Sequence, residues 1–172
     1  MNVNRRGLIR LSFILAAALS IPTAVTAQQK SLKDQLIGTW TFVSASDTNK
    51  DGAKTDRWGA NAKGLAIFEA NGRYSFMISR SDIPKFAIDN ANQGTAEENK
   101  AAVRGVIAHI GTWSVDEATK TLVTAIEASS FPNLNGISQK RIIGSLTASE
   151  LKYTNPASST GAVSEVTWKR VP

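Results

Sequence analysis

Residues 36–44 read Leu36-Ile37-Gly38-Thr39-Trp40-Thr41-Phe42-Val43-Ser44, and this stretch decides the fold. Larger and smaller side chains alternate along it, which indicates a β-strand with one buried face. Its first part, Ile-Gly-Thr-Trp at 37–40, recurs letter for letter at 110–113. A glycine, one spacer and a tryptophan at the start of an early strand is a common opening of small closed β-barrels. We therefore expect Gly38 and Trp40 to start and close a barrel.

If Trp40 lies where the barrel closes, its side chain should contact a residue of the last strand. A buried tryptophan contributes a large apolar area and needs a hydrogen-bond partner for its indole N–H. Arg170 lies in the last predicted strand, and closure would bring the first and last strands together. We expect Arg170 to stack on Trp40 through a cation–π contact, with Arg141 as the other candidate.

The rest of the chain consists of short β-type segments separated by turn signals. Asn71-Gly72 separates two of them and suits a type I′ hairpin turn. Thr95 with Glu98 three residues later is a capping-box pattern that predicts one helix. Its apolar spacing extends to Ile110, although Gly105 is a candidate end. We predict an all-β, antiparallel barrel of about eight strands with one helix. The predicted strands cover residues 37–44, 65–68, 73–79, 110–115, 121–128, 137–144, 150–154 and 162–171.

Residues 1–27 have the pattern of a cleavable signal peptide. A positively charged start is followed by an apolar run at 11–19 and by small residues before Ala27. The apolar run is shorter than the ~20 residues that a membrane span needs, so we expect no integral span after cleavage. Cleavage after Ala27 would leave a lead-in at 28–35 and a barrel domain at 36–172.

The export route has two candidates. The adjacent Arg5 and Arg6 resemble a twin-arginine signal, which exports folded proteins, and an ordinary Sec leader is the alternative. Both routes predict a periplasmic or secreted protein. The chain contains no cysteine, so neither a lipid-anchored cysteine nor a disulfide is available in that compartment.

Charge and composition exclude several classes of function. Three of the 20 basic residues, Arg5, Arg6 and Arg10, lie in the leader, so 17 basic and 14 acidic residues remain, a net charge of +3. No basic cluster with interleaved aromatic residues suggests a nucleic-acid partner. With no cysteine and one histidine, His109, the sequence predicts no metal site and no thiol chemistry. It also lacks nucleophile, phosphate-binding and dinucleotide motifs, so we predict no catalytic residues and no cofactor.

Four segments in this order resemble the bacterial and fungal lipocalin-like domain family, which is related or analogous to the lipocalin and fatty-acid-binding barrels. They are residues 36–44, residues 58–68 with Asn71-Gly72 and Tyr74-Ser75, residues 111–116 continuing through 127–133 to Gly136, and residues 168–171. The resemblance implies a barrel and a possible cavity, not a reaction. Ala108-His109-Ile110 stands where the family usually has an aromatic residue before the second Gly-Thr-Trp.

Two groups of residues are candidates for a ligand site. Glu127 and Arg141 lie on neighbouring predicted strands and would pair inside the barrel, or hold a ligand's carboxylate or hydroxyl, if both point inward. The alternative is that one or both face solvent. The second group consists of the aromatic side chains that could line a cavity, with core packing as their alternative role. They are Tyr74, Phe76, Trp113, Phe131 and Tyr153.

Three functions remain open, and we favour the first, which is not enzymatic. The barrel would bind or carry a small apolar molecule in an apolar interior of roughly 300–1,000 Å³. Alternatively, it would be an isomerase or cyclase with His109, Glu127 or Tyr153 projecting into the cavity. A structural or interaction protein would instead have a packed core and an exposed apolar patch.

Overall fold

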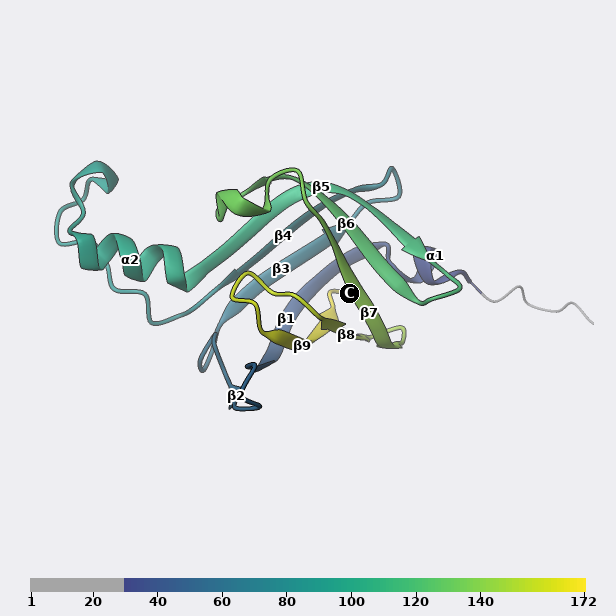
Figure 1. The fold of residues 1–172 in the computed structure, drawn as a ribbon. Helices are drawn as coiled ribbons and strands as arrows, with labels where there is room; N and C mark the ends of the chain where they lie inside the picture. The colour runs from purple at the N-terminus through teal and green to yellow at the C-terminus, as the bar shows by residue number, and fades with distance from the viewer. Residues whose placement is uncertain (1–29) are drawn as a thin grey trace, which may run out of the picture.

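The computed structural model describes residues 30–172, and the chain folds into a closed antiparallel barrel (Figure 1). Its sheet has nine strands, of which the two-residue β2 (Lys54–Thr55) only flanks β1, so eight strands form the barrel. The predicted fold class is confirmed, whereas the predicted signal peptide lies outside the described residues. The barrel strands are β1 (Gly38–Thr48), β3 (Lys63–Phe68), β4 (Arg73–Ser79), β5 (Val106–Asp116), β6 (Thr121–Ser129), β7 (Ser138–Leu146), β8 (Glu150–Asn155) and β9 (Val163–Arg170).

Consecutive strands pair along the whole barrel, and β1 pairs with β9 to close it. The closing register runs from Trp40 opposite Arg170 to Thr48 opposite Val163, with a bulge between Phe42 and Ser44. Closure satisfies the backbone groups that an open sheet would leave unpaired at its two edges.

Helical segments lie at both ends of the barrel. The short α1 (Leu32–Leu36) lies at one end, and α2 (Ala96–Gly105) projects away from the other (Figure 1). Two 3₁₀ turns, η1 (Ala91–Gln93) and η2 (Pro132–Leu134), complete the structure. Within residues 30–172, no helix has the length and apolar character needed to cross a membrane.

The predicted capping box of α2 is present, because the Thr95 side chain accepts from the backbone N–H of Glu98 while the Glu98 side chain accepts from that of Thr95. The helix ends at Gly105, the candidate end that the sequence offered. The apolar spacing at residues 106–110 therefore does not belong to a helix. The chain continues directly into β5, where β-branched residues favour a strand. A side chain at Gly105 would also come within 2.5 Å of Ile83.

The hairpin between β3 and β4 forms, but not with the expected turn. A type I′ turn needs positive φ at both central residues, and here Gly72 has φ of 87° while Asn71 does not have a positive φ. The Gly72 N–H donates to the Glu69 carbonyl, so the loop spans residues 69–72. The Asn71 side chain accepts from the backbone N–H of Arg73, which stabilises this longer loop.

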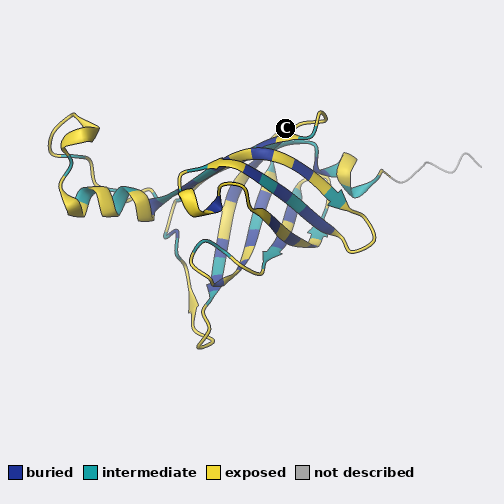
Figure 2. Ribbon diagram, turned by 45° about the horizontal axis from the view of Figure 1, so that its top comes forward, coloured by how far each residue is buried: buried dark blue, intermediate teal, exposed yellow. Residues whose placement is uncertain are grey.

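Inward and outward residues alternate along the strands, as Figure 2 shows in the bands of buried and exposed colour. The end nearest α1 is filled by large apolar side chains, which include Leu36, Trp40, Phe68 and Trp113. Polar inward side chains gather farther along, on the inner faces of β4 to β7. This division leaves one end of the barrel solidly packed and places the chemically distinctive residues toward the other.

Two fully buried tryptophans differ in their hydrogen bonding, which predicts different responses to the same substitution. The Trp40 indole N–H donates to the Leu36 carbonyl at 2.9 Å, whereas that of Trp168 has no partner among residues 30–172. Both changes to Phe remove apolar contacts, but Trp168→Phe also removes an unsatisfied buried donor. We expect Trp168→Phe to retain at least about 1 kcal/mol more unfolding free energy than Trp40→Phe, measured by urea denaturation. An equal or larger loss for Trp168→Phe would contradict this interpretation.

Candidate functional site

The packed end of the barrel is held by Arg170, which joins the first strand to the last. Its guanidinium lies 4.1 Å from the centroid of the Trp40 ring. It donates to the backbone carbonyls of Gln35, Ile37 and Ala148. Gly38 is adjacent, with φ of 127°, and a Cβ there would lie 2.8 Å from the Arg170 guanidinium. These contacts are structural, and they leave the other end of the barrel as the candidate site.

A polar cluster lies inside the barrel, on adjacent strands. The Arg141 guanidinium on β7 donates to the Thr124 hydroxyl at 2.5 Å and to the Gln139 side-chain carbonyl at 2.8 Å. The Tyr74 hydroxyl and His109 Nδ1 form a third hydrogen bond, of 2.9 Å. Alternation explains the placement of three of these residues. Arg141 lies two positions from the buried Ile143, His109 from Ile107, and Thr124 from Leu122 and Ile126.

Aromatic rings surround these polar groups. Phe76 stacks on the His109 ring, with centroids 4.4 Å apart and planes within 5° of parallel. The Arg141 guanidinium lies 5.8 Å from the Phe76 centroid and 5.7 Å from that of Tyr153. Both rings thus contact a desolvated cation, a geometry in which cation–π attraction is strong.

Burial and the nearby cation determine the charge state of His109, which is 4% exposed. Burial, helped by the positive charge of Arg141, lowers its pKa from 6.5 to about 3. His109 is therefore neutral at physiological pH. The pKa of Tyr74 is raised, mainly by burial, while Arg141 and a hydrogen bond with Thr124 act in the opposite direction. Tyr74 is therefore also neutral, and Arg141 is the charged member of the cluster.

A cavity of about 50 Å³ extends from this cluster to the end of the barrel nearest α2. A buried water needs roughly 10–15 Å³ by this measure, so the space holds only a few atoms. The expectation of a roomy interior of 300–1,000 Å³ is wrong, because large side chains fill most of the barrel. The lining residues are Arg57, Trp58, Phe76, Ile78, Ile107, His109, Leu134, Gln139, Arg141, Tyr153, Asn155, Ser158, Ser159, Ser164 and Val166.

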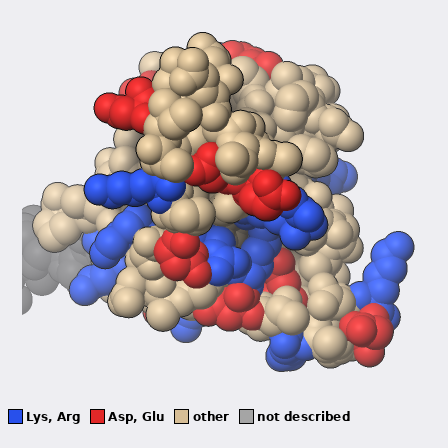
Figure 3. All heavy atoms as spheres, turned by 90° about the vertical axis from the view of Figure 1, so that its left-hand side faces the viewer, with Lys and Arg blue, Asp and Glu red and all other residues tan. Residues whose placement is uncertain are grey.

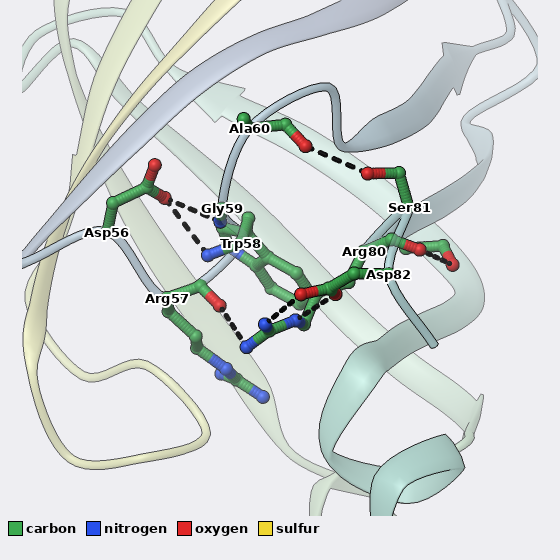
Figure 4. Close-up of polar contacts among 9 residues, drawn as sticks. Asp56, Arg57, Trp58, Gly59, Ala60, Arg80, Ser81 and Asp82 are labelled. Atoms are coloured by element: carbon green, nitrogen blue, oxygen red, sulfur yellow. Dashed lines mark hydrogen bonds and ion pairs between the residues drawn. The ribbon is translucent and has the colours of Figure 1, made fainter. Parts of the chain in front are cut away.

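Arg57 and Trp58 line the cavity, and both lie in a loop whose polar contacts Figure 4 draws. The Asp56 carboxylate accepts from the backbone N–H groups of Trp58 and Gly59, both at 3.0 Å. Arg80 donates to the Arg57 carbonyl at 3.4 Å, which joins the loop to the end of β4. The Trp58 indole is buried, and the Arg57 guanidinium lies 4.6 Å from its ring centroid. Trp58 is therefore a buried part of the cavity wall.

The outer surface beside the mouth carries charges of both signs. Figure 3 views the molecule from the side on which α2 projects, and basic side chains lie between acidic ones there. A groove of about 440 Å³ is lined by Arg57, Arg80 and Arg104 together with Asp47 and Asp56. Arg80 is paired with Asp82 at 2.6 Å. The outer groove therefore carries positive and negative charges together and does not favour a ligand of one sign.

The structure separates the residues that the sequence suggested for a ligand site. Phe76, Arg141 and Tyr153 line the cavity. Tyr74 and Trp113 point into the core below the cavity, and Phe131 lies half-buried beside the core.

The expected role of Glu127 as a ligand contact inside the barrel is wrong. Glu127 lies on the outer face, where it binds Arg73 at 2.5 Å, so it neither pairs with Arg141 nor reaches the interior. Leu122, Thr124 and Ile126 all point inward, and the two-residue period of β6 therefore turns Glu127 outward. The proposed enzyme alternative thus keeps only His109 and Tyr153 in the cavity.

The cavity also contains residues that the sequence did not suggest as ligand contacts, notably Trp58, Gln139 and Ser164. Gln139 had a usable signal, since it precedes Arg141 by two positions and thus shares its face. Trp58 lies in a loop whose path along the cavity no local periodicity indicates. No group of three or more potential metal-ligating side chains occurs within the described part of the chain.

Comparison with known proteins assigns the family. The model of the lipocalin-like domain matches residues 37–171, so the chain belongs to this family. No curated protein matches the chain.

Solved structures match the chain with low identity and with TM-scores below 0.5. One is a lipocalin-like protein from Bacteroides uniformis, with 11% identity, a TM-score of 0.45, and coverage of 80% of this chain and 99% of that chain. A designed fluorescence-activating β-barrel has 12% identity, a TM-score of 0.43, and coverage of 83% and 100%. Bovine odorant-binding protein in complex with a selenium-containing odorant has 17% identity, a TM-score of 0.40, and coverage of 85% and 75%.

Proposed function

We propose that this lipocalin-like barrel binds a small, largely apolar molecule at the end where Trp58 lines the cavity. The observation that carries the proposal is the cavity that leads from the mouth to a buried polar cluster. Binding sites for small molecules combine apolar walls with a few placed polar groups, and this cavity has that composition. Ile107, Val166 and Trp58 supply apolar wall, while Gln139 and Arg141 supply polar atoms.

The size of the cavity indicates how such a ligand would lie. About 50 Å³ accommodates one end of a molecule and not the whole of it. We expect the polar end to enter the barrel and the apolar part to lie at the mouth, where it would contact or displace the Trp58 indole. Binding is favoured over acid–base catalysis because His109, with a pKa of about 3, is a weak base at neutral pH.

The test uses a neutral apolar fluorophore, N-phenyl-1-naphthylamine, titrated into the folded protein. Val166 is buried on β9 and lines the cavity, so Val166→Phe should fill the space. Val163 on the same strand is 40% exposed, so Val163→Phe is the matched control. We expect saturable binding to the unaltered protein and to Val163→Phe, with affinity for Val166→Phe at least about tenfold weaker, a loss of about 1.4 kcal/mol.

Two outcomes would contradict this function. One is the absence of saturable fluorescence enhancement in the unaltered protein. The other is equal affinity in Val166→Phe and Val163→Phe, since the probe would then be bound on the outer surface. Thermal unfolding of both variants checks that each retains the fold.

A further inference from the structure

Within the part of the chain that the structure describes, the cavity is lined by positively charged side chains and by no negatively charged ones. Two of its residues are arginines, Arg57 at the mouth and Arg141 inside, and none is an aspartate or glutamate. Burial lowers the pKa of Arg57, and the negative charge of Asp47 opposes this effect. Arg57 therefore has a carboxylate nearby. Arg141 is the cation that has no such compensation.

Arg141 is 3% exposed and is not part of any ion pair among residues 30–172. A guanidinium has five N–H donors, and the structure assigns it two hydrogen bonds, both to neutral acceptors. A buried charge is ordinarily paired or binds a ligand, because desolvation without compensation is costly. Arg141 thus retains both charge and donors that the fold does not neutralise.

The nearby carboxylates of the fold are engaged elsewhere. Glu127 is bound to Arg73 on the outer face of the barrel. Asp47 is buried and accepts a hydrogen bond from the Ser164 hydroxyl. Neither forms an ion pair with Arg141 across the cavity.

We propose that Arg141 binds the carboxylate of an amphiphilic monocarboxylic acid whose apolar chain extends toward Trp58. This inference rests on the proposed function and specifies the ligand class of the same site. A carboxylate matches the planar fork of a guanidinium and accepts two parallel hydrogen bonds. The polar end of such an acid also fits a space of about 50 Å³. The aromatic rings of Phe76 and Tyr153, already in contact with the guanidinium, exclude water from the ion pair.

The test compares three probes of equal chain length by isothermal titration calorimetry: hexanoate, hexan-1-ol and hexylamine. They share an apolar chain and differ in the charge of the polar end. We expect the unaltered protein to bind hexanoate at least about tenfold more tightly than hexan-1-ol, and hexylamine most weakly. A charge-assisted hydrogen bond of about 1.5–3 kcal/mol corresponds to about 10–150-fold in affinity.

Variants identify the residue responsible. Arg141→Met should bind hexanoate and hexan-1-ol equally. Arg141→Lys, which keeps the charge and loses the fork, should show an intermediate preference. The matched control is Arg73→Met, which removes an exposed arginine from the outer face and should leave the preference unchanged. Circular dichroism verifies the fold, and the comparison of the three probes on the unaltered protein requires no variant.

The outcomes separate the ligand class from the binding function. If hexan-1-ol binds as tightly as hexanoate, or if Arg141→Met keeps the preference, the carboxylate assignment is overturned and the binding function stands. If none of the three probes binds and N-phenyl-1-naphthylamine also fails to bind, the binding function itself is overturned, and the assignment with it.

Discussion

Gly111→Ala is expected to destabilise the barrel severely, by about 3–5 kcal/mol, or to prevent folding. Gly111 lies where β5 and β6 shift register, and a Cβ there would lie 1.9 Å from the backbone carbonyl oxygen of Ala125. Because the obstructing atom belongs to a paired strand, no side-chain rotation relieves the clash. Urea denaturation monitored by tryptophan fluorescence measures the loss.

Gly144→Ala is the matched control, since Gly144 also lies at a register shift, between β7 and β8. A Cβ at Gly144 would meet its nearest atom at 3.9 Å, which is ordinary contact, and its φ is not positive. We expect a change within about 0.5 kcal/mol. Comparable losses in the two variants would show that steric contact at Gly111 is not the cause.

Stability should fall by about 2 kcal/mol between pH 6.5 and pH 4.5 because of His109. The folded-state pKa of about 3 lies below the ordinary 6.5, so the unfolded state binds more protons between these values. The stabilising contribution is therefore complete above pH 6.5 and is lost as the pH falls toward 3. His109 is the only histidine in the chain, so no other side chain of this type contributes to the change.

His109→Gln supplies the control, because glutamine does not titrate and can still hydrogen-bond Tyr74. Several surface carboxyls, among them Glu98 and Asp116, have lowered pKa values and contribute mainly below this window. We expect the unfolding free energy of His109→Gln to change little between pH 6.5 and 4.5. A decline as steep as that of the unaltered protein would refute the assignment to His109.

The repeated Ile-Gly-Thr-Trp predicted the barrel correctly, but the physical reason for glycine differs between the copies. Gly38 has positive φ and lies against Arg170, whereas Gly111 has ordinary φ and lies against the backbone of β6. Both requirements arise from partners distant in sequence. Local periodicity therefore indicated strands and could not distinguish the two glycines.

The candidate site was less accessible to sequence reasoning than the fold. The sequence identified Arg141 as a candidate but left open whether it pairs with Glu127 or whether one of the two faces solvent. The inward residues of β6 decide this, because they turn Glu127 outward. His109 stands where the family usually has an aromatic residue, and the structure shows that this position lines the cavity. The volume of the interior depends on how all inward side chains pack together, which no single segment determines.

Pairing of β1 with β9 has a consequence for how the chain reaches its native state. Trp40 and Arg170 are opposite each other in the closed sheet although nearly the whole folded chain separates them. Such distant contacts slow folding, because loop entropy is lost before the contacts form. Until β9 is in place, β1 and β8 expose edges that can pair with other molecules. Docking of β9 therefore removes both exposed edges at once.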